Sequence, residues 1–224
     1  MLYADRAHAG RVLADALRPY AGRSDVVVLA LPRGGVPVAY RVAEALDAPL
    51  DVFLVRKLGF PGSEEFAMGA IASGGVRVLN EPVLDRYGVP EALVETVARR
   101  EGLALARRER SYRGGLPPLD VRGKTVIVVD DGLATGFSMR AAVTALRSLS
   151  PRRIVVAVPV GPRESIEALR RLADEVVCPS IPEPFLAVGH FYDDFEQTSD
   201  REVVDLLSRA RPERSANEPA GSHA

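Results

Sequence analysis

The segment from residue 126 to residue 138 constrains this chain more than any other. Its first four residues are all β-branched, Asp130 and Asp131 follow directly, and a short turn rich in glycine and hydroxyl residues comes next. The unbroken apolar run predicts a buried strand of a parallel sheet, and the apolar spacing over 140–149 predicts a helix. We therefore expect an α/β fold in which a polar loop joins this strand to this helix, at the sheet edge where such folds bind ligands.

The turn after the two acids has the features of a phosphate site. It opens a helix, so its first N–H groups point toward an anion together with the hydroxyls of Thr135 and Ser138. Glycines at 132 and 136 permit a tight turn. Asp130 and Asp131 need a separate explanation, because like charges do not assist phosphate binding. Carboxylates accept hydrogen bonds from hydroxyls, so the diol of a phosphorylated sugar would fit both parts of the motif.

This motif resembles the phosphoribosyl-pyrophosphate (PRPP) signature of the type I phosphoribosyltransferases. The resemblance implies that Asp130 and Asp131 bind the ribose hydroxyls. It also implies that the 5-phosphate is bound by the turn residues Ala134, Thr135, Gly136, Phe137 and Ser138. An ordinary strand-to-helix turn is the simpler interpretation, and a receiver domain also carries acids at strand ends. Neither accounts for a Thr-Gly-x-Ser turn placed directly after the acids.

Two further loops carry cations at strand ends. Residues 31–37 read Leu-Pro-Arg-Gly-Gly-Val-Pro and resemble the family's pyrophosphate loop, which commonly contains a strained or cis peptide. The pyrophosphate-binding candidates in it are Arg33, Gly34 and Gly35. Residues 55–62 resemble a stretch of the adenine phosphoribosyltransferases that precedes a loop closing over the active site. This resemblance makes Arg56 and Lys57 candidates for neutralising the departing pyrophosphate, and the alternative is a pair of solvated surface cations.

The remaining pattern predicts a doubly wound parallel sheet with flanking helices, the type I phosphoribosyltransferase-like architecture that the resemblance implies. Strands are expected at residues 26–31, 50–55, 126–129, 154–158 and 175–178. Helices are expected at 6–20, 36–46, 91–112, 140–149, 163–172 and 199–207, with Asp5 and Ser199 as N-caps. Short strands are expected near 70 and at 76–79, after an irregular, mobile loop at 59–65.

These elements are expected to form one phosphoribosyltransferase-like domain over residues 1–211. It contains a helical insertion at about 59–122, which the family resemblance does not cover. A small C-terminal hood at 179–198 would cover the acceptor. Residues 212–224 are polar and predicted to be a disordered tail.

The acceptor is the least constrained part of the site. Enzymes for 6-oxopurines usually carry an acid directly before the Thr-Gly of the turn, and Ala134 stands there in this chain. A 6-oxopurine acceptor is therefore disfavoured. In the hood, aromatic side chains could stack on a flat ring and an acid could accept its proton. The base-binding candidates are Phe185, Phe191, Tyr192 and Asp193. The alternative is that Phe185 and Phe191 anchor the C-terminal segment on the core.

Composition argues against several classes of protein. The 29 basic and 30 acidic residues give a net charge of −1, so no overall positive field favours nucleic acid. Cys178 is the single cysteine and the three histidines are scattered, which argues against a disulfide framework and a structural metal site. No apolar run reaches membrane-spanning length and the N-terminus lacks the pattern of a leader peptide, so the expected location is the cytoplasm.

Together these features predict an enzyme that moves 5-phosphoribosyl from PRPP to a nitrogen acceptor, in the first place a nucleobase, and releases pyrophosphate. The resemblance implies nucleotide salvage, a homodimer, and Mg²⁺ as cofactor, bound mainly through the substrate with Asp130 and Asp131 as candidate protein ligands. An alternative is a PRPP-sensing regulator without transferase activity, for which the arginines of the 91–112 helix would supply a partner surface. A relative of PRPP synthases is a third option, but the sequence offers no second nucleotide site.

Overall fold

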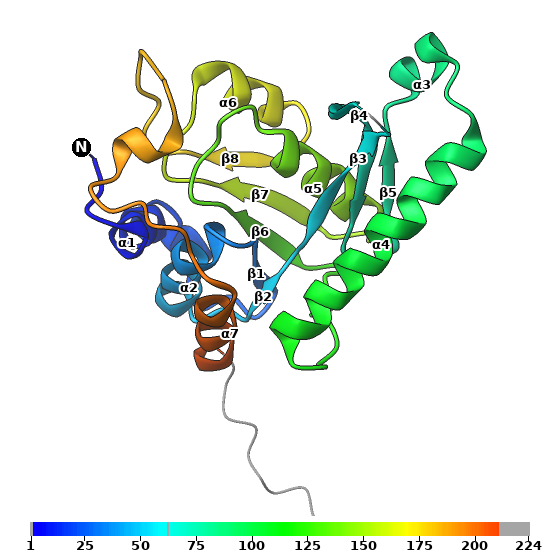
Figure 1. The fold of residues 1–224 in the computed structure, drawn as a ribbon. Helices are drawn as coiled ribbons and strands as arrows, with labels where there is room; N and C mark the ends of the chain where they lie inside the picture. The colour runs from blue at the N-terminus through cyan, green and yellow to red at the C-terminus, as the bar shows by residue number, and fades with distance from the viewer. Residues whose placement is uncertain (1, 62, 211–224) are drawn as a thin grey trace, which may run out of the picture.

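The computed structural model describes residues 2–61 and 63–210, with the backbone alone at 63–66. Its centre is a parallel sheet in the order β2-β1-β6-β7-β8 (Figure 1). The strands are β1 (Val26–Ala30), β2 (Leu50–Val52), β6 (Thr125–Val129), β7 (Arg153–Ala157) and β8 (Glu175–Val177). The predicted doubly wound α/β sheet is confirmed. Strand order reverses between β1 and β6, and the crevice at such a reversal is where open α/β sheets bind ligands.

Helices cover both faces of this sheet because its central strands are apolar on both sides. Every residue of β1 and β6 is buried. In β1, Val28 belongs to the core that includes α1 and α2, whereas its neighbour Leu29 belongs to the core that includes α5 and α6. This alternation follows from the opposite directions of successive side chains in a strand. The four helices are α1 (Arg6–Ala16), α2 (Gly35–Leu46), α5 (Phe137–Ser148) and α6 (Arg163–Arg170).

The predicted N-caps are present. The Asp5 carboxylate accepts a first-turn backbone N–H of α1 at 2.6 Å. The Ser199 hydroxyl accepts one of α7 (Asp200–Arg209) at 3.1 Å. However, α1 is shorter than predicted, and a separate 3₁₀ turn containing Pro19 follows it. The reason is that Pro19 has no N–H to donate to the preceding helical turn.

The insertion contains a small antiparallel sheet, and here two predictions are wrong. Its strands, in the order β3-β4-β5, are β3 (Val55–Phe60), β4 (Ser63–Ala72) and β5 (Arg77–Leu79). The expected strand at 50–55 is split, since β2 ends in the main sheet and β3 begins in the second one. The expected irregular loop at 59–65 is a β-hairpin with a register shift at Gly59. Gly62, next to its turn, lies outside the described residues.

Two helices complete the insertion: α3 (Glu81–Tyr87), which no sequence pattern predicted, and α4 (Glu91–Arg113), which was expected. α4 packs along β3 and β4, and its C-terminal end approaches β2 and α7 (Figure 1). That end is fixed by a buried ion pair between Arg113 Nε and Asp51 Oδ2 on β2, at 3.0 Å. The C-terminal end of the insertion's long helix is therefore anchored to the main sheet.

The segment predicted as the hood is tied to the N-terminus of the chain. Tyr3 forms an isolated parallel bridge with Tyr192, and α7 then packs against α2 and α4. Residues 211–224, and with them the predicted disordered tail, lie outside the described residues, so the extent of the domain stays a prediction. None of the described helices is both long and apolar enough to cross a membrane.

Candidate functional site

Two loops interlock at the carboxyl ends of β1 and β6. A Cβ added to Gly34 would lie 2.0 Å from Asp131 Oδ2, and one added to Gly35 would lie 2.8 Å from the Val129 carbonyl oxygen and 2.9 Å from Asp130 Cα. A side chain at position 35 would meet backbone atoms, and one at position 34 would have to displace the Asp131 carboxylate, so the two glycines permit this close approach. The loop predicted to hold pyrophosphate therefore lies directly against the acids predicted to hold the ribose.

The two acids form an electrostatically coupled pair. The Asp131 backbone N–H donates to Asp130 Oδ1 at 2.9 Å. Burial, and then the charge of Asp131, raises the pKa of Asp130 well above its usual range. Burial also raises the pKa of Asp131, although the nearby Arg6 guanidinium opposes the rise. A nearby cation, or hydroxyl groups that donate hydrogen bonds, would stabilise the negative charge of these two buried carboxylates.

Arg6 is part of this cluster, although no sequence pattern pointed to it. Its Nε lies 2.8 Å from Asp131 Oδ2, and only 12% of the Arg6 side chain and 15% of the Asp131 side chain are exposed. Arg6 Nη1 donates to the Glu196 carbonyl oxygen at 2.6 Å, and its Cζ lies 3.9 Å from the centre of the Phe195 ring. The helix α1 thus joins the acid pair to the C-terminal segment.

The turn after the acids has the geometry of an anion site. Gly136 is the N-cap of α5 and has a φ of 68°, a left-handed conformation that glycine adopts without strain. The first N–H groups of a helix have no partner within it and carry its positive dipole end. Thr135 and Ser138 are exposed at this end. The Ser165 hydroxyl on α6 donates to the Ala134 carbonyl at 2.7 Å and braces the turn.

Arg33 lies next to the interlocked glycines, but its guanidinium is directed toward α7. The Pro32–Arg33 peptide bond is cis, in agreement with the family resemblance. Arg33 Nη1 lies 4.0 Å from Asp200 Oδ1. The hydroxyl of the buried Tyr112, on α4, donates to the same Asp200 oxygen. Arg33 is therefore held at a junction of α4 and α7.

Arg56, the first of the two predicted cations after β2, is paired with an acid of α4. Both cations lie on β3 of the insertion sheet. Arg56 Nη2 lies 2.6 Å from Glu101 Oε2 on α4, and Glu101 also accepts from Arg100 Nε at 3.0 Å. Glu101, which holds Arg56, and Tyr112, at the Arg33 junction, are about three turns apart on α4. The two predicted pyrophosphate arginines are therefore held by different groups.

The hood differs from its prediction at Tyr192. This side chain is 2% exposed, its ring packs against Tyr3 and Phe195, and its hydroxyl donates to the Asp131 carbonyl at 2.6 Å. Tyr192 is not available to stack on a ligand, because its side chain is buried and its ring and hydroxyl have partners within the chain. Its position instead fixes the backbone of Asp131.

The other hood candidates lie nearer the surface. Phe185 and Phe191 stack on each other, with ring centres 5.2 Å apart and planes at 30°, and both pack against the small core that contains Tyr3. This arrangement fits the anchoring alternative. Asp193 is exposed, and its backbone N–H donates to the Tyr3 carbonyl at 2.9 Å. Phe195, which sequence reasoning missed, is the hood ring that contacts Arg6.

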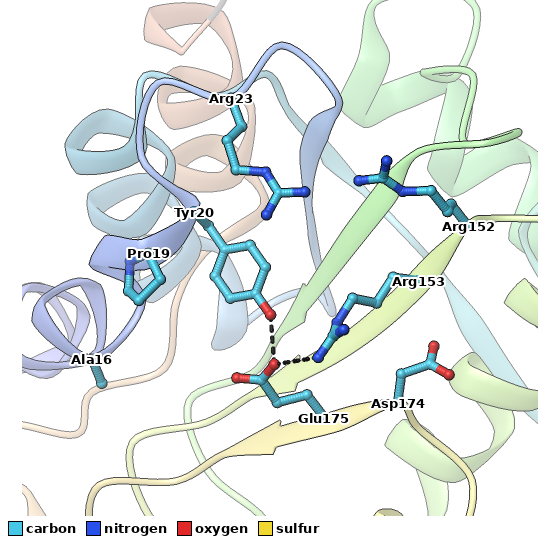
Figure 2. Close-up of a pocket in the computed structure, with 8 residues that line it drawn as sticks. All are labelled: Ala16, Pro19, Tyr20, Arg23, Arg152, Arg153, Asp174 and Glu175. Carbon is cyan, nitrogen blue, oxygen red and sulfur yellow. Dashed lines mark hydrogen bonds and ion pairs between the residues drawn. The ribbon is translucent and has the colours of Figure 1, made fainter.

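A cavity of ≈ 550 Å³ opens at the other end of the strands, near the amino ends of β7 and β8 (Figure 2). Each of its charged side chains has an ion-pair partner, either within the cavity or beside it. Glu175 accepts from the Tyr20 hydroxyl at 2.5 Å and from Arg153 Nη2 at 2.8 Å, while Arg23 and Arg152 both bind Asp25. Its size alone does not make this cavity a functional site, and it lies away from the loops described above.

Residues 2–196 match the family model of the phosphoribosyl transferase domain. A Mycobacterium tuberculosis protein named "Putative phosphoribosyl transferase" is 46% identical over 209 residues, 93% of this chain and 47% of that protein. The chain thus spans about half the length of this curated relative. The "Bifunctional protein PyrR" of Chloroflexus aurantiacus is 33% identical over 129 residues, 56% of this chain and 65% of that protein.

Among solved structures, the crystal structure of protein TT1426 from Thermus thermophilus is similar over nearly its whole length. Its TM-score is 0.84 at 46% sequence identity, covering 95% of this chain and 100% of that chain. The fold described above therefore has an experimental counterpart in a protein of similar length.

Proposed function

This chain belongs to the phosphoribosyltransferase family, and from that premise we propose that it transfers 5-phosphoribosyl from PRPP to a nitrogen acceptor, with a nucleobase as the first candidate. The observation that carries the proposal is the interlocking of the two loops at the strand-order reversal. The space that a side chain at Gly34 would need is occupied by the Asp131 carboxylate. The loop with Gly34 and Gly35, which is suited to pyrophosphate, therefore lies against acids that are suited to a diol. The N-terminus of α5 follows these acids in the chain.

Each part of PRPP has a matching group in this arrangement. Asp130 and Asp131 would accept hydrogen bonds from the ribose hydroxyls, and the turn from Ala134 to Ser138 would bind the 5-phosphate. The backbone at Gly34 and Gly35 would bind the pyrophosphate. The bond from the anomeric carbon to the pyrophosphate oxygen breaks, the carbon–nitrogen bond forms, and the acceptor's proton passes to a base. Holding both partners still and stabilising the leaving dianion provide the catalysis.

Magnesium fits the acid pair as a substrate-borne cation. Adjacent carboxylates whose pKa values are raised by burial gain from a nearby positive charge. In the described part of the chain no group of three or more His, Cys, Asp or Glu side chains could hold a metal. Mg²⁺ commonly uses one or two carboxylates together with substrate phosphates. When bound through Asp130 or Asp131 it would neutralise charge on the pyrophosphate.

The remaining predicted contacts require a change in side-chain partners. For Arg56 to bind pyrophosphate, its guanidinium has to leave Glu101, and Arg33 has to turn from Asp200. A dianion competes well for such groups, since its hydrogen bonds to guanidinium are charge-assisted and bidentate. We propose that Arg33, Arg56 and Lys57 join the site when PRPP is present.

A second candidate function, that of a PRPP-responsive regulator, is favoured by the outer face of α4. Arg99, Arg107 and Arg110 are exposed there, and the side chain of Leu103 between them is 60% exposed. Leu103 and these arginines could together form a contact with a partner protein. The same face could instead support the homodimer that the family resemblance implies. Sedimentation of the protein with and without PRPP shows whether this face supports self-association.

The transferase proposal is tested by pyrophosphate release from PRPP and Mg²⁺ across a panel of nucleobases and simple amines. The comparison protein is the Asp130→Asn/Asp131→Asn double variant, which keeps the side-chain shapes and removes the charges. We expect release with one acceptor and its loss in the variant. If PRPP binds and no acceptor supports release, the regulator becomes the better account. If the wild-type protein does not bind PRPP, both candidates fail.

A further inference from the structure

Arg6 lies where three separate parts of the chain meet. It is the first residue of α1, it binds the Asp131 carboxylate after β6, and it contacts Phe195 and Glu196 shortly before α7. These contacts join residues that are 125 and 190 positions apart in the sequence. A guanidinium is suited to such a junction because its planar fork donates several hydrogen bonds in fixed directions while its face stacks on a ring.

The contacts at Asp131 show what Arg6 could control. Arg6 Nε bonds to Oδ2, the same oxygen that fills the space beside Gly34. The Tyr192 hydroxyl holds the Asp131 carbonyl oxygen on the opposite side of the residue. Arg6 thus fixes one carboxylate oxygen of Asp131, and Tyr192 fixes its backbone carbonyl. The contact with Arg6 therefore restricts the orientation of the Asp131 carboxylate.

A contribution to the stability of the fold does not by itself explain the ion pair between Arg6 and Asp131. Taking both charges out of water costs about as much as the pair recovers, so a buried ion pair typically contributes little net stability. The Arg6 guanidinium is held more precisely than it would need to be to neutralise the charge of Asp131. One oxygen is bound at 2.8 Å, and the guanidinium is held in place by a main-chain carbonyl and an aromatic ring. Such a contact orients a carboxylate, and orientation is what the binding of a diol requires.

We propose that Arg6 is a positioning residue of the PRPP site, which fixes the Asp131 carboxylate in the orientation that binds the ribose. The inference rests on the proposed function and adds a role for the N-terminal helix and the C-terminal segment. Removing Arg6 lets the Asp131 side chain rotate toward its other rotamers, so PRPP binding has to offset the cost of ordering it. Because Arg6 acts through Asp131, its effect depends on that carboxylate.

The test measures the dissociation constant of PRPP with Mg²⁺ by calorimetry, which does not require the acceptor to be known. Arg6→Gln is compared with the wild type, with Arg6→Lys, and with Arg11→Gln, a variant of an exposed arginine on the same helix. We expect affinity to fall about tenfold in Arg6→Gln, less in Arg6→Lys, and not in Arg11→Gln, as for the loss of one well-placed charged contact. Circular dichroism verifies that each variant is folded.

A double-mutant cycle tests whether Arg6 affects PRPP binding through Asp131. In the background of Asp131→Asn, Arg6→Gln is expected to change PRPP affinity less than about twofold, because contacting residues are not additive. Unchanged affinity in folded Arg6→Gln would overturn the inference, and so would a full tenfold loss in the Asp131→Asn background. If Arg6→Gln does not fold, Arg6→Lys decides, and wild-type affinity in it would count against the proposal. Absence of PRPP binding to the wild type would instead refute the proposed function itself.

Discussion

The Asp131 carboxylate occupies the space that a side chain on Gly34 would need. A Cβ at Gly34 would lie 2.0 Å from Asp131 Oδ2, far inside van der Waals contact, and 3.3 Å from Arg6 Nε. This relationship joins a loop after β1 to a loop after β6, and it ties the two proposed halves of the PRPP site together. Any residue larger than glycine at position 34 has to displace the carboxylate.

Gly34→Ala is therefore expected to weaken PRPP binding by at least about tenfold while the protein stays folded, because Asp131 has to turn away from Arg6. Calorimetry with PRPP and Mg²⁺ measures the effect. Gly102→Ala on α4 is the matched control, since its added Cβ would approach only the terminal methyl of Ile71, at 3.2 Å. Equal PRPP affinity in both variants would show that the Asp131 orientation does not matter.

Replacing Thr135 tests the phosphate turn. Thr135→Val keeps the shape and removes a hydroxyl from the N-terminus of α5, so affinity for PRPP should fall by about ten- to a hundredfold, since one hydrogen bond to a charged group contributes about 1.5–3 kcal/mol. Thr144→Val, farther along the same helix, removes a hydroxyl that bonds only to the Arg140 carbonyl and should leave affinity unchanged. A common loss in both variants would point to a general effect on α5.

The Asp51–Arg113 pair should be among the costliest contacts to break. Both side chains are buried, at 7% and 6% exposure, and Arg113 also donates to the Val52 carbonyl at 2.8 Å. Arg113→Met leaves a buried carboxylate without its charge partner, so we expect the free energy of unfolding to fall by about 3–5 kcal/mol. Urea denaturation gives the value. Arg110→Met, at an exposed position of α4, should cost less than about 0.5 kcal/mol.

Acid stability should depend on Asp25, at the cavity near the amino ends of the strands. Hydrogen bonding from Arg23 is the main cause that lowers the pKa of Asp25 to about 2, with help from Thr125 and Arg152. A lowered pKa means that Asp25 stabilises the fold above its usual titration range and loses that contribution as pH falls through about 2. Urea midpoints across this range should fall more steeply for the wild type than for Asp25→Asn. Parallel curves would contradict the assignment.

Sequence patterns predicted those elements that are determined by residues adjacent in the sequence. The β6 strand, its acids and the turn into α5 are contiguous, so pattern and chemistry agree within one short segment. The caps at Asp5 and Ser199 follow for the same reason, because a side chain bonds to a backbone N–H three residues on. The resemblance to phosphoribosyltransferases that residues 126–138 carry is confirmed by the family model that matches residues 2–196.

The errors concern contacts between distant segments. The run at 50–55 is apolar apart from Asp51, and nothing within it indicates that the chain leaves one sheet and enters another between β2 and β3. The turn residues at 59–65 predicted a mobile loop and gave no sign that the strands on each side pair with each other. Arg6 was missed because its partner Asp131 is 125 positions away, and Tyr192 was misread because its burial depends on packing against Tyr3.

A crystal structure with PRPP and Mg²⁺ tests the central claim most directly. The account predicts ribose hydroxyls within hydrogen-bond distance of Asp130 and Asp131, the 5-phosphate against the turn from Thr135 to Ser138, and the pyrophosphate at Gly34 and Gly35. PRPP bound in another place, such as the cavity beside Arg153, or seated with its hydroxyls turned away from the two acids, would contradict it.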